Sequence, residues 1–485
     1  MLKMQFSIVF KTVGLLLMLF SLTQLPPIIV DFIYAQNEAL YFITAFFLTL
    51  LSGFVLWLPF KNSTKDFRIR EGVLVVVSFW LVLSLFATTP FLLSTSLEMS
   101  FSDAFFESMS GLTTTGATVL SGLDGLPKAL LYYRQQLQWL GGMGIIVLAV
   151  AILPMLGVGG MELYHAESSG ISKERLTPKL TQTAKALWKI YISLTVACAL
   201  SYYFAGMDVF NAIGYSYSTI AIGGFSTHDV SIGYFNSYAI ELVAIIFMLL
   251  AGVNFSLHFL VWRKNNIFIY LKDSEFKTYL LILGISIMLI SGYLFDTGYY
   301  KTIEESVRYG VFQSVSMVTT TGFVSTDFSL WPFVLPVFLI FVSFIGACAG
   351  STGGGIKVVR ILLMFKLAMQ EIKKFIHPNA QINIKLNQKS VSENTLVSVW
   401  GFLSLYVIAF VVIMLMLMFS GLEQVSAFSA AAASINNLGP GLGDVSANYG
   451  GISDTAKWIL SFSMLLGRLE ILTLMALLHK AFWRF

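Results

Sequence analysis

The sequence predicts an all-α membrane protein that crosses the bilayer many times. Of its 485 residues, 56% are hydrophobic and 12% are charged, whereas a soluble chain carries roughly 25% charged residues. The mean hydropathy is +0.78. The apolar runs continue for about twenty residues, which is the length of a transmembrane helix. A soluble globule, a disordered chain and an alternating β-barrel are therefore excluded.

Ten membrane helices are predicted from the apolar runs. They lie roughly at 12–30, 40–58, 72–95, 132–156, 186–205, 237–262, 278–297, 332–372, 396–420 and 456–483. The first run follows Lys3 and Lys11, as in a signal peptide, but it exceeds the core of about 7–15 residues that signal peptides have. It also lacks a cleavage site of the A-x-A type. We therefore interpret it as a retained helix.

The eight helices after the first two form four pairs, and each pair encloses an unusual stretch. These stretches lie near 101–120, 207–227, 304–326 and 423–443. Each is too short to span a membrane and too apolar to be solvated, which is typical of a re-entrant half-helix followed by a loop. The predicted units are an N-terminal hairpin at 1–70 and pore repeats at 71–182, 183–275, 276–392 and 393–485.

The basic residues orient the chain. Of the 30 Lys and Arg residues, 24 fall at the two ends or in the segments that join one helix pair to the next. Under the positive-inside rule these segments and both termini are cytoplasmic, as in a multi-pass protein of a bacterial inner membrane. Two termini on one side require an even number of spans, which agrees with ten. The four re-entrant stretches then face outside.

Two of these stretches repeat each other without a gap. Residues 106–116 read FESMSGLTTTG and residues 312–322 read FQSVSMVTTTG, with seven identities in eleven positions. Small-residue helix packing favours Gly, Ser and Thr, but it does not predict the same order in two helix pairs. The other two stretches match more weakly, with TIAIGGFST at 219–227 and SINNLGPG at 434–441. We therefore predict four quasi-equivalent modules around one axis.

Four loops of irregular backbone at membrane depth define a pore, because such backbone is tolerated only where it is buried or lines a water-filled cavity. One glycine per loop allows carbonyl oxygens to turn inward and replace the hydration shell of a cation. The candidate filter residues are Thr113, Thr114, Thr115 and Gly116; Ile220, Ala221, Ile222 and Gly223; Thr319, Thr320, Thr321 and Gly322; and Asn436, Asn437, Leu438 and Gly439.

The loop cores contain no carboxylate, so we expect them to select a weakly hydrated monovalent cation, with potassium as the obvious candidate. Each preceding half-helix should aim its negative C-terminal end at the pore. Four acids lie just outside the loops: Asp124, Asp229, Asp327 and Asp444. They either concentrate cations at the mouth or are ordinary loop residues. Cys198 and Cys348 lie in apolar stretches and are interpreted as small buried hydrophobes.

The four repeats with one glycine per loop resemble the superfamily of potassium transporters that contains TrkH, KtrB and HKT proteins. The extra N-terminal helix pair is similar to TrkH rather than KtrB, and the resemblance covers essentially the whole chain. Each loop keeps part of the T-V-G-Y-G signature of potassium channels, and the fourth departs furthest. The resemblance implies potassium uptake, a homodimer with one pore per protomer, and a cytosolic TrkA ring that binds nucleotides.

The third repeat has a glycine-rich break, GACAGSTGGG, at residues 346–355. It does not fit a phosphate-binding P-loop, because Ile356 follows the last glycine where that motif needs lysine. A helix kink or close helix packing is one interpretation. The other, supported by the resemblance, is a mobile gate loop below the filter. Its glycines are Gly346, Gly350, Gly353, Gly354 and Gly355.

Arg468 lies deep in the last predicted helix, about 20 Å from either end. An arginine within the membrane is costly and is a candidate functional residue by default. Two interpretations stay open, and both can hold: an electrostatic barrier in the pore, which the resemblance supports, and a salt bridge to another helix. Glu470 is close in sequence but points to a different helix face.

Three classes of function were compared. A gated, channel-like potassium uptake protein is preferred over a symporter coupled to sodium or protons, because few titratable groups lie in the predicted membrane interior. An intramembrane enzyme is disfavoured, since no H-E-x-x-H or G-x-S-x-G motif occurs. The chain needs no cofactor of its own, and no nucleic-acid partner is expected. Basic segments at 173–189 and 357–389 either receive the cytosolic partner or contact lipid headgroups.

Overall fold

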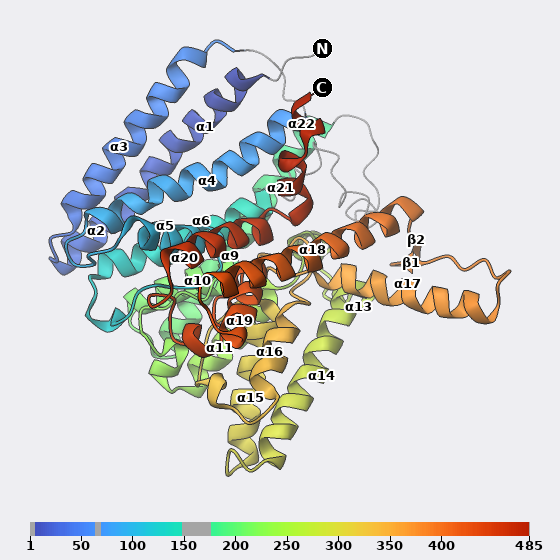
Figure 1. Ribbon diagram of the computed structural model, residues 1–485. Coiled ribbons are helices and arrows are strands. Elements are labelled where there is room, and N and C mark those ends of the chain that lie inside the picture. Colours follow the sequence, from blue (N-terminus) through green and yellow to red (C-terminus); the bar gives the residue numbers. More distant parts are fainter. Residues whose placement is uncertain (1–4, 64–68, 148–175, 485) are drawn as a thin grey trace.

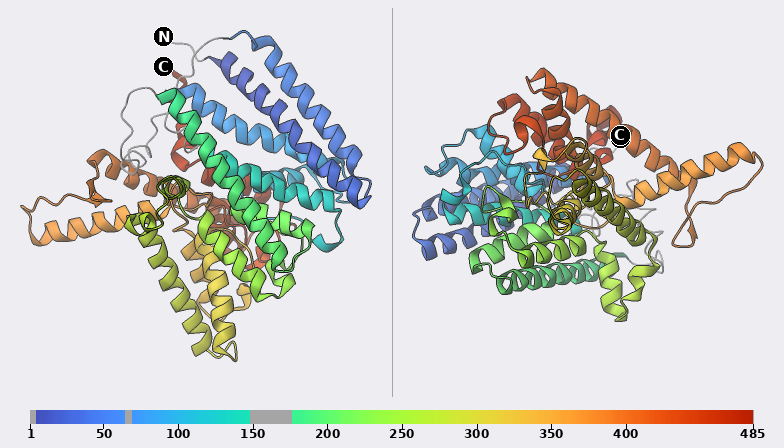
Figure 2. Two further views of the ribbon diagram at one scale, coloured as in Figure 1. Left: turned by 180° about the vertical axis from the view of Figure 1, so that it is seen from behind. Right: turned by 90° about the horizontal axis from the view of Figure 1, so that it is seen from below.

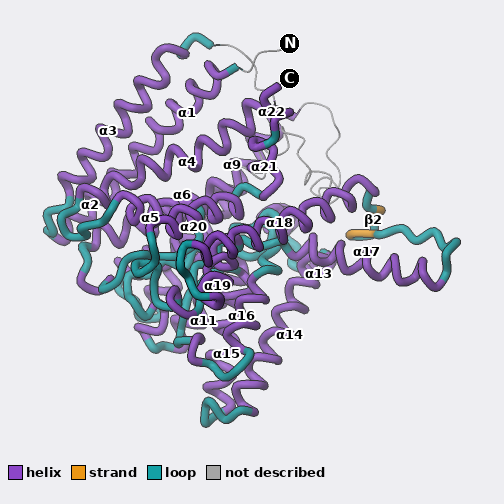
Figure 3. Tube along the Cα trace, viewed as in Figure 1, coloured by secondary structure: helices purple, strands orange, loops and turns teal. Residues whose placement is uncertain are grey.

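The computed structural model describes residues 5–63, 69–147 and 176–484, and the chain in these ranges is almost entirely helical (Figures 1 and 3). Several residues with a predicted role lie outside the described residues: Lys3, Lys65, Arg68, the 148–156 end of one predicted helix and the 173–175 start of one basic segment.

The N-terminal hairpin packs through a close backbone contact. Helix α1 (Phe6–Ser21) continues through the 3-10 turn η1 (Leu22–Gln24) into α2 (Leu25–Tyr34), and α3 (Ala39–Trp57) with η2 (Leu58–Phe60) returns beside it. A Cβ atom at Gly14 would lie 2.7 Å from the carbonyl oxygen of Gly53. Small residues thus let the two backbones approach closely, as is common between membrane helices.

After the hairpin, the order long helix, short helix, second helix occurs four times. The helices are α4 (Ile69–Leu93), α5 (Phe101–Leu112) and α6 (Lys128–Val147); α9 (Leu176–Phe204), α10 (Val209–Ala221) and α11 (Tyr238–Ala251); α14 (Ser274–Asp296), α15 (Ile303–Thr319) and α16 (Leu335–Ser343); and α18 (Glu393–Phe419), α19 (Gln424–Ile435) and α20 (Asp454–Arg468). Single 3-10 turns lie between the short and second helices: η3 (Leu123–Gly125), η5 (Ser231–Phe235), η6 (Phe328–Leu330) and η7 (Gly443–Val445).

Side-chain N-caps fix the start of three of the short helices. Ser100, Asp208 and Thr302 each accept a hydrogen bond from the backbone N–H three residues later, at 3.2, 3.3 and 3.2 Å. Such caps satisfy one of the donors that a helix N-terminus leaves unpaired. These three short helices therefore begin where the sequence places Ser, Asp or Thr.

Six helices in the described ranges are long and apolar enough to cross a membrane, or up to eight if each of two bent pairs counts as one span. The predicted span at 132–156 corresponds to α6, which carries Arg134, Gln135, Gln136 and Gln138 in its middle. The predicted span at 332–372 is divided between α16 and α17 (Val358–Ile376), with irregular backbone over most of the segment between them. Ten spans therefore remain a prediction.

Two predicted helices are bent, which hydropathy could not indicate. The run at 237–262 forms α11 and α12 (Phe255–Lys264), which meet at 91°. The run at 456–483 forms α20 and α21 (Ile471–Leu478), which meet at 114°, followed by α22 (Lys480–Arg484). Asn254 caps the start of α12, because its side chain accepts a hydrogen bond from the N–H of Ser256 at 2.8 Å.

One long segment projects from the bundle. Figures 1 and 2 show α17 and the loop after it extending away from the other helices. The base of α17 contacts α14, which follows the short helix α13 (Phe268–Lys272). A small antiparallel hairpin of β1 (Lys385–Leu386) and β2 (Lys389–Ser390) then leads into α18. Asn387 at its turn bonds back to the start of α14: its amide donates to Asp273 at 2.8 Å and its oxygen accepts from the N–H of Ser274 at 2.7 Å.

Candidate functional site

The loops after the four short helices share one backbone conformation. In each loop a non-glycine residue adopts a left-handed conformation, and two residues later a glycine has a positive φ. The non-glycine residues are Thr114 (φ 53°), Ile222 (53°), Thr320 (65°) and Asn437 (52°). The glycines are Gly116 (φ 81°), Gly224 (79°), Gly322 (79°) and Gly439 (96°). Left-handed Thr and Ile are rare in proteins, so a fourfold recurrence indicates a specific local structure.

The left-handed residues end the short helices. In each case the next N–H bonds to the carbonyl five residues earlier, which is the six-to-one bond of a Schellman motif. These bonds run from Thr115 to Ser110 (2.9 Å), from Gly223 to Ser218 (2.8 Å), from Thr321 to Ser316 (2.8 Å) and from Leu438 to Ala433 (2.7 Å). The four helices therefore stop in the same way at equivalent residues, with their negative C-terminal ends directed at the loops.

These equivalences correct one part of the predicted site. The sequence pattern aligned Gly223 with Gly116, Gly322 and Gly439, but the glycine with positive φ in the second loop is Gly224. The predicted register of that loop is wrong by one residue, and the set equivalent to the other three loops runs from Ala221 through Gly224. Because Gly223 and Gly224 are adjacent, the sequence alone could not show which of them is equivalent to the glycines of the other loops.

The four loops form a closed ring. A Cβ atom on Gly116 would overlap the carbonyl oxygen of Gly223 in the second loop, and one on Gly224 would overlap that of Thr321 in the third. The same holds for Gly322 against Leu438 in the fourth loop. For Gly439 the distance to the carbonyl oxygen of Thr115, in the first loop, is 2.7 Å. Each glycine thus lies against a carbonyl of the next loop, and that carbonyl belongs to the residue just before the equivalent glycine.

The ring is buried and rich in hydroxyl and amide groups. The Thr, Asn, Ala, Ile and Leu residues predicted for the filter are at most 1% exposed. Thr113 bonds to Thr115 at 2.8 Å, and the equivalent pair Thr319 and Thr321 does so at 2.7 Å. In the fourth loop the Asn437 amide donates to the Thr115 hydroxyl at 2.9 Å, so it joins the last repeat to the first.

The glycine-rich segment at 346–355 lies directly against the ends of the short helices. The Thr352 hydroxyl donates to the carbonyl of Ile220 at 2.9 Å, and the N–H of Gly354 donates to the Thr320 hydroxyl at 2.7 Å. A Cβ atom at Gly354 would overlap the carbonyl oxygen of Asn436. The segment therefore contacts the second, third and fourth repeats.

Positive φ values and backbone anchors shape this segment. Gly346, Gly350 and Gly355 have φ values of 72°, 69° and 74°, which glycine adopts readily. The Cys348 N–H donates to the carbonyl of Gly252 at 3.0 Å, and the Phe255 N–H donates to the carbonyl of Gly350 at 3.0 Å. The bend between α11 and α12 is therefore where the segment docks. Gly353 and Gly354 face the loops instead.

Glu275 at the start of α14 bonds both to the segment and to the first turn of α17. Its carboxylate accepts hydrogen bonds from the N–H groups of Ala349 at 2.6 Å and Val359 at 3.2 Å, and the residue is 2% exposed. It directly follows Ser274, which bonds to Asn387 of the β-hairpin. The projecting segment and the glycine-rich segment therefore meet at one helix N-terminus.

Arg468 completes the contacts below the ring. Its two terminal nitrogens donate to the carbonyls of Thr352 at 3.0 Å and Gly141 at 3.2 Å, and the residue is 3% exposed. Gly141 belongs to α6 of the first repeat. No ion pair involves Arg468 among the described residues, and Glu470 pairs instead with Arg360 of α17 at 2.7 Å. Within the described residues, the structure therefore does not show the salt bridge that was one of the two interpretations of Arg468.

A cavity of about 60 Å³ lies next to these contacts. It is lined by backbone of the glycine-rich segment and by Lys357, Arg360, Arg468 and Glu470, among others. The amine of Lys357 bonds to the carbonyl of Gly353. Positive side chains therefore line a cavity that also reaches Asn437 of the fourth loop.

The four acids outside the loops make local contacts. Asp124 pairs with His228, and Asp229 accepts from the N–H of Leu123 at 3.1 Å. Asp327 accepts from the N–H of Ser329 at 3.0 Å, and Asp444 accepts from the Ser426 hydroxyl at 3.1 Å. Each side chain thus has a structural partner. In the described ranges no three His, Cys, Asp or Glu residues converge on a metal site, so any bound ion at the ring would rest on carbonyls and hydroxyls.

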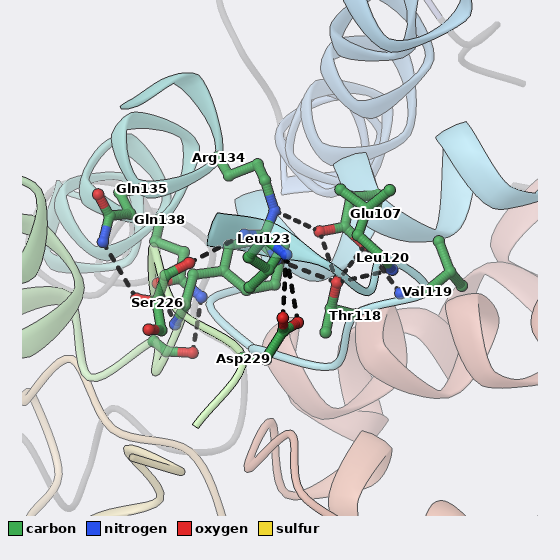
Figure 4. Close-up of polar contacts among 12 residues, drawn as sticks. Glu107, Thr118, Val119, Leu120, Leu123, Arg134, Gln135, Gln138, Ser226 and Asp229 are labelled. Carbon is green, nitrogen blue, oxygen red and sulfur yellow. Dashed lines mark hydrogen bonds and ion pairs between the residues drawn. The ribbon is translucent and has the colours of Figure 1, made fainter. Parts of the chain in front are cut away.

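Sequence reasoning missed a polar cluster behind the first and second loops (Figure 4). Arg134 and Glu107 form an ion pair at 2.6 Å, and the two side chains are 1% and 0% exposed. Gln138, one turn after Arg134, bonds to the backbone of the second loop. The signal available in the sequence was the unusual polarity of α6 in a predicted membrane helix.

Comparisons with known proteins agree over nearly the whole chain. A family model described as TrkH, cation transport protein, matches residues 39–482. The chain is 50% identical to the Trk system potassium uptake protein TrkH of Halomonas elongata over 482 residues, covering 99% of this chain and 100% of that protein. It is 49% identical to the protein of that name from Escherichia coli (strain K12), with the same coverage.

A solved structure is equally similar. The crystal structure of the potassium transporter TrkH from Vibrio parahaemolyticus matches with a TM-score of 0.92 and 49% sequence identity. The match covers 99% of this chain and 100% of that chain.

Proposed function

The chain belongs to the TrkH family of cation transport proteins, and from this premise we propose that it conducts potassium across the membrane through the ring of four loops. The family is one of membrane ion transporters and not of enzymes, which agrees with the sequence-based exclusion of an enzyme. Its similar relatives are named potassium uptake proteins.

The ring of glycines and carbonyls is the observation that carries the proposal. Four carbonyls precede four positive-φ glycines in a closed order, at the negative ends of four short helices. Neutral oxygens in a ring suit a dehydrated monovalent cation, whereas rings of carboxylates are common in other cation pores. We assign the filter to the residues named above, with Ala221 through Gly224 as the second set.

The glycine-rich segment and Arg468 are proposed as the gate. Their contacts with all four repeats, directly below the ring, support a closed conformation in which a fixed positive charge opposes cation passage. The five glycines of the segment allow it to move without steric penalty. The anchors at Glu275 and at the bend of α11 and α12 would be released on opening.

The wider assignments follow the same proposal. We propose ten spans, with both termini in the cytoplasm of a bacterial inner membrane, four pore repeats with the boundaries given above, and a homodimer. A cytosolic TrkA-like ring would control the gate. The contact of Asn387 with the start of α14, one residue before Glu275, supports the β-hairpin as its route to the gate. Nucleotides would bind the partner and not this chain.

The test is the reversal potential of purified protein in a planar bilayer. A channel gives a current that reverses at the potassium equilibrium potential, whatever the sodium and proton gradients. A symporter, the alternative, shifts the reversal with one of those gradients. A protein that passes no potassium under any gradient would contradict both.

A further inference from the structure

We propose that Arg134, Glu107 and Gln138 form a brace that positions the second filter loop against the first and thereby sets how well the pore discriminates potassium from sodium. The inference rests on the proposed function. It concerns residues that lie behind the ring and do not contact its centre, so they are positioning residues.

Arg134 joins three separate stretches of chain. Its Nε bonds to the Glu107 carboxylate at 2.6 Å, one terminal nitrogen donates to the carbonyl of Ser226 at 3.0 Å, and the other donates to the Thr118 hydroxyl at 3.0 Å. The guanidinium also lies over the Phe225 ring, 4.3 Å from its centroid. All of its nitrogens are therefore used, and its planar fork fixes the relative positions of these stretches.

Glu107 holds the chain that leaves the first loop. Its carboxylate accepts from the Thr118 hydroxyl at 3.0 Å and from the N–H of Val119 at 3.0 Å. These residues come two and three positions after Gly116. Ser226, bonded to Arg134, comes two positions after Gly224. The ion pair thus connects equivalent points of two neighbouring loops.

Gln138 acts on the ring itself. Its amide nitrogen donates to the carbonyl of Gly223 at 2.6 Å, and its oxygen accepts from the N–H of Phe225 at 3.0 Å. The same Gly223 carbonyl is the one that leaves no space for a side chain on Gly116. One glutamine on α6 therefore sets the direction of a ring carbonyl through two hydrogen bonds (Figure 4).

The brace is asymmetric within the ring. In the ungapped repeat, Gln313 of the third repeat occupies the position of Glu107, and it accepts from the N–H of Ser325 at a longer 3.5 Å. Among the ion pairs of the described residues, only Arg134 with Glu107 has both side chains at most 1% exposed. The boundary between the first and second loops is therefore the one with a fully buried ion pair among the described residues.

A contribution to stability does not account for such a pair. Buried ion pairs can often be replaced by apolar residues of similar volume without loss of stability, because removing two charges from water offsets their attraction. What the pair supplies in addition is a fixed geometry with many directed bonds. Carbonyl positions in a filter decide which ion fits, so this geometry acts on selectivity.

The experiment measures reversal potentials of the full-length protein with potassium on one side of a bilayer and sodium on the other. The reversal potential reports the permeability ratio and does not depend on how often the gate is open. We test Gln138→Leu, and Arg134→Met combined with Glu107→Gln, which avoids an unpaired buried charge. The matched control is Arg308→Met with Glu241→Gln, an ion pair at 2.7 Å whose arginine is 11% exposed and which does not contact the ring loops.

We expect the potassium-to-sodium permeability ratio to fall about tenfold in the brace variants and to stay unchanged in the control, a tenfold change being worth about 1.4 kcal/mol. A merely structural role would reduce the yield of folded protein and leave this ratio unaltered.

If the paired variant does not fold, Gln138→Leu alone decides, since it removes no charge. Suppose that the unmodified protein conducts potassium and that folded Gln138→Leu has the same permeability ratio. That result overturns the proposed brace and leaves the proposed function standing. Unmodified protein that passes no potassium overturns the proposed function as well.

Discussion

Gly322 combines a backbone conformation that disfavours side chains with a neighbour that leaves them no space. Its φ is 79°, and a Cβ atom would overlap the carbonyl of Leu438 and lie 2.7 Å from Pro440. The same carbonyl is a proposed ion ligand. A side chain at this position would therefore displace both the loop that carries it and the next loop in the ring.

We expect Gly322→Ala to lower rubidium flux into vesicles at least about tenfold, which corresponds to roughly 1.4 kcal/mol on the barrier. The control is Gly401→Ala in α18, where no atom lies within 4 Å of the new methyl group and φ is not positive. Unchanged flux in folded Gly322→Ala protein would remove this loop from the filter.

Arg468 contributes a charge and two hydrogen bonds to the proposed closed conformation. Replacing it with alanine removes the positive charge below the ring and both contacts, to Thr352 and Gly141. We expect Arg468→Ala to raise rubidium flux several-fold in vesicles that contain no partner protein. Lys374→Ala, which removes an exposed lysine paired with Glu371 on α17, should leave the flux unchanged. Equal or lower flux in well-folded Arg468→Ala would count against a gate at this residue.

At the level of elements, the glycine-rich segment is held by several contacts along its length. Glu275 bonds to Ala349 within the segment and to Val359 at the start of α17. Glu275→Ala leaves two buried N–H groups without an acceptor, each at a cost of about 1–3 kcal/mol. This penalty falls on the closed conformation.

We therefore expect Glu275→Ala to raise the partner-free rubidium flux, and Glu275→Gln, which keeps one acceptor oxygen, to raise it less. Glu371→Ala serves as the control, because that side chain is 63% exposed and lies on the outer part of α17. The order of the three fluxes is the readout. A flux in Glu275→Ala no higher than in the control would show that the anchor does not restrain the gate.

The positions of the four short helices could be predicted from the sequence, but the exact register of the loops after them could not. Two of the loops follow a shared run of residues. In all four stretches, the change from apolar sequence to Gly, Ser, Thr and Asn indicates where the short helix ends. The second loop was misregistered by one residue because Gly223 and Gly224 are adjacent, and only φ distinguishes them. The bends after α11 and α20 went unpredicted, because apolar runs report length and not direction.

The brace behind the ring shows a different limit. Glu107 and Arg134 are 27 positions apart, and Ser226 is a further 92 positions from Arg134. No local pattern connects them, since the contact exists only when two modules are placed side by side. The polar run in α6 was visible in the sequence as an anomaly, but its partners depended on the tertiary arrangement.

At the scale of the whole molecule, one chain builds a ring from four unequal parts. The first and second loops are joined by a buried ion pair, the fourth is joined to the first through Asn437, and a segment of the third repeat lies against the second, third and fourth repeats. Because the four loops belong to one chain, each boundary between two loops can have different contacts. Four identical subunits could not provide this. The proposed brace and the proposed gate therefore lie at different boundaries of the ring.

The closure of the ring between Gly439 and Thr115 has a consequence for biosynthesis. These residues come from the last and the first repeat, so the circle is complete only when almost the entire polypeptide has left the ribosome and entered the bilayer. A chain that stops before the fourth repeat therefore lacks the loop that joins the third to the first.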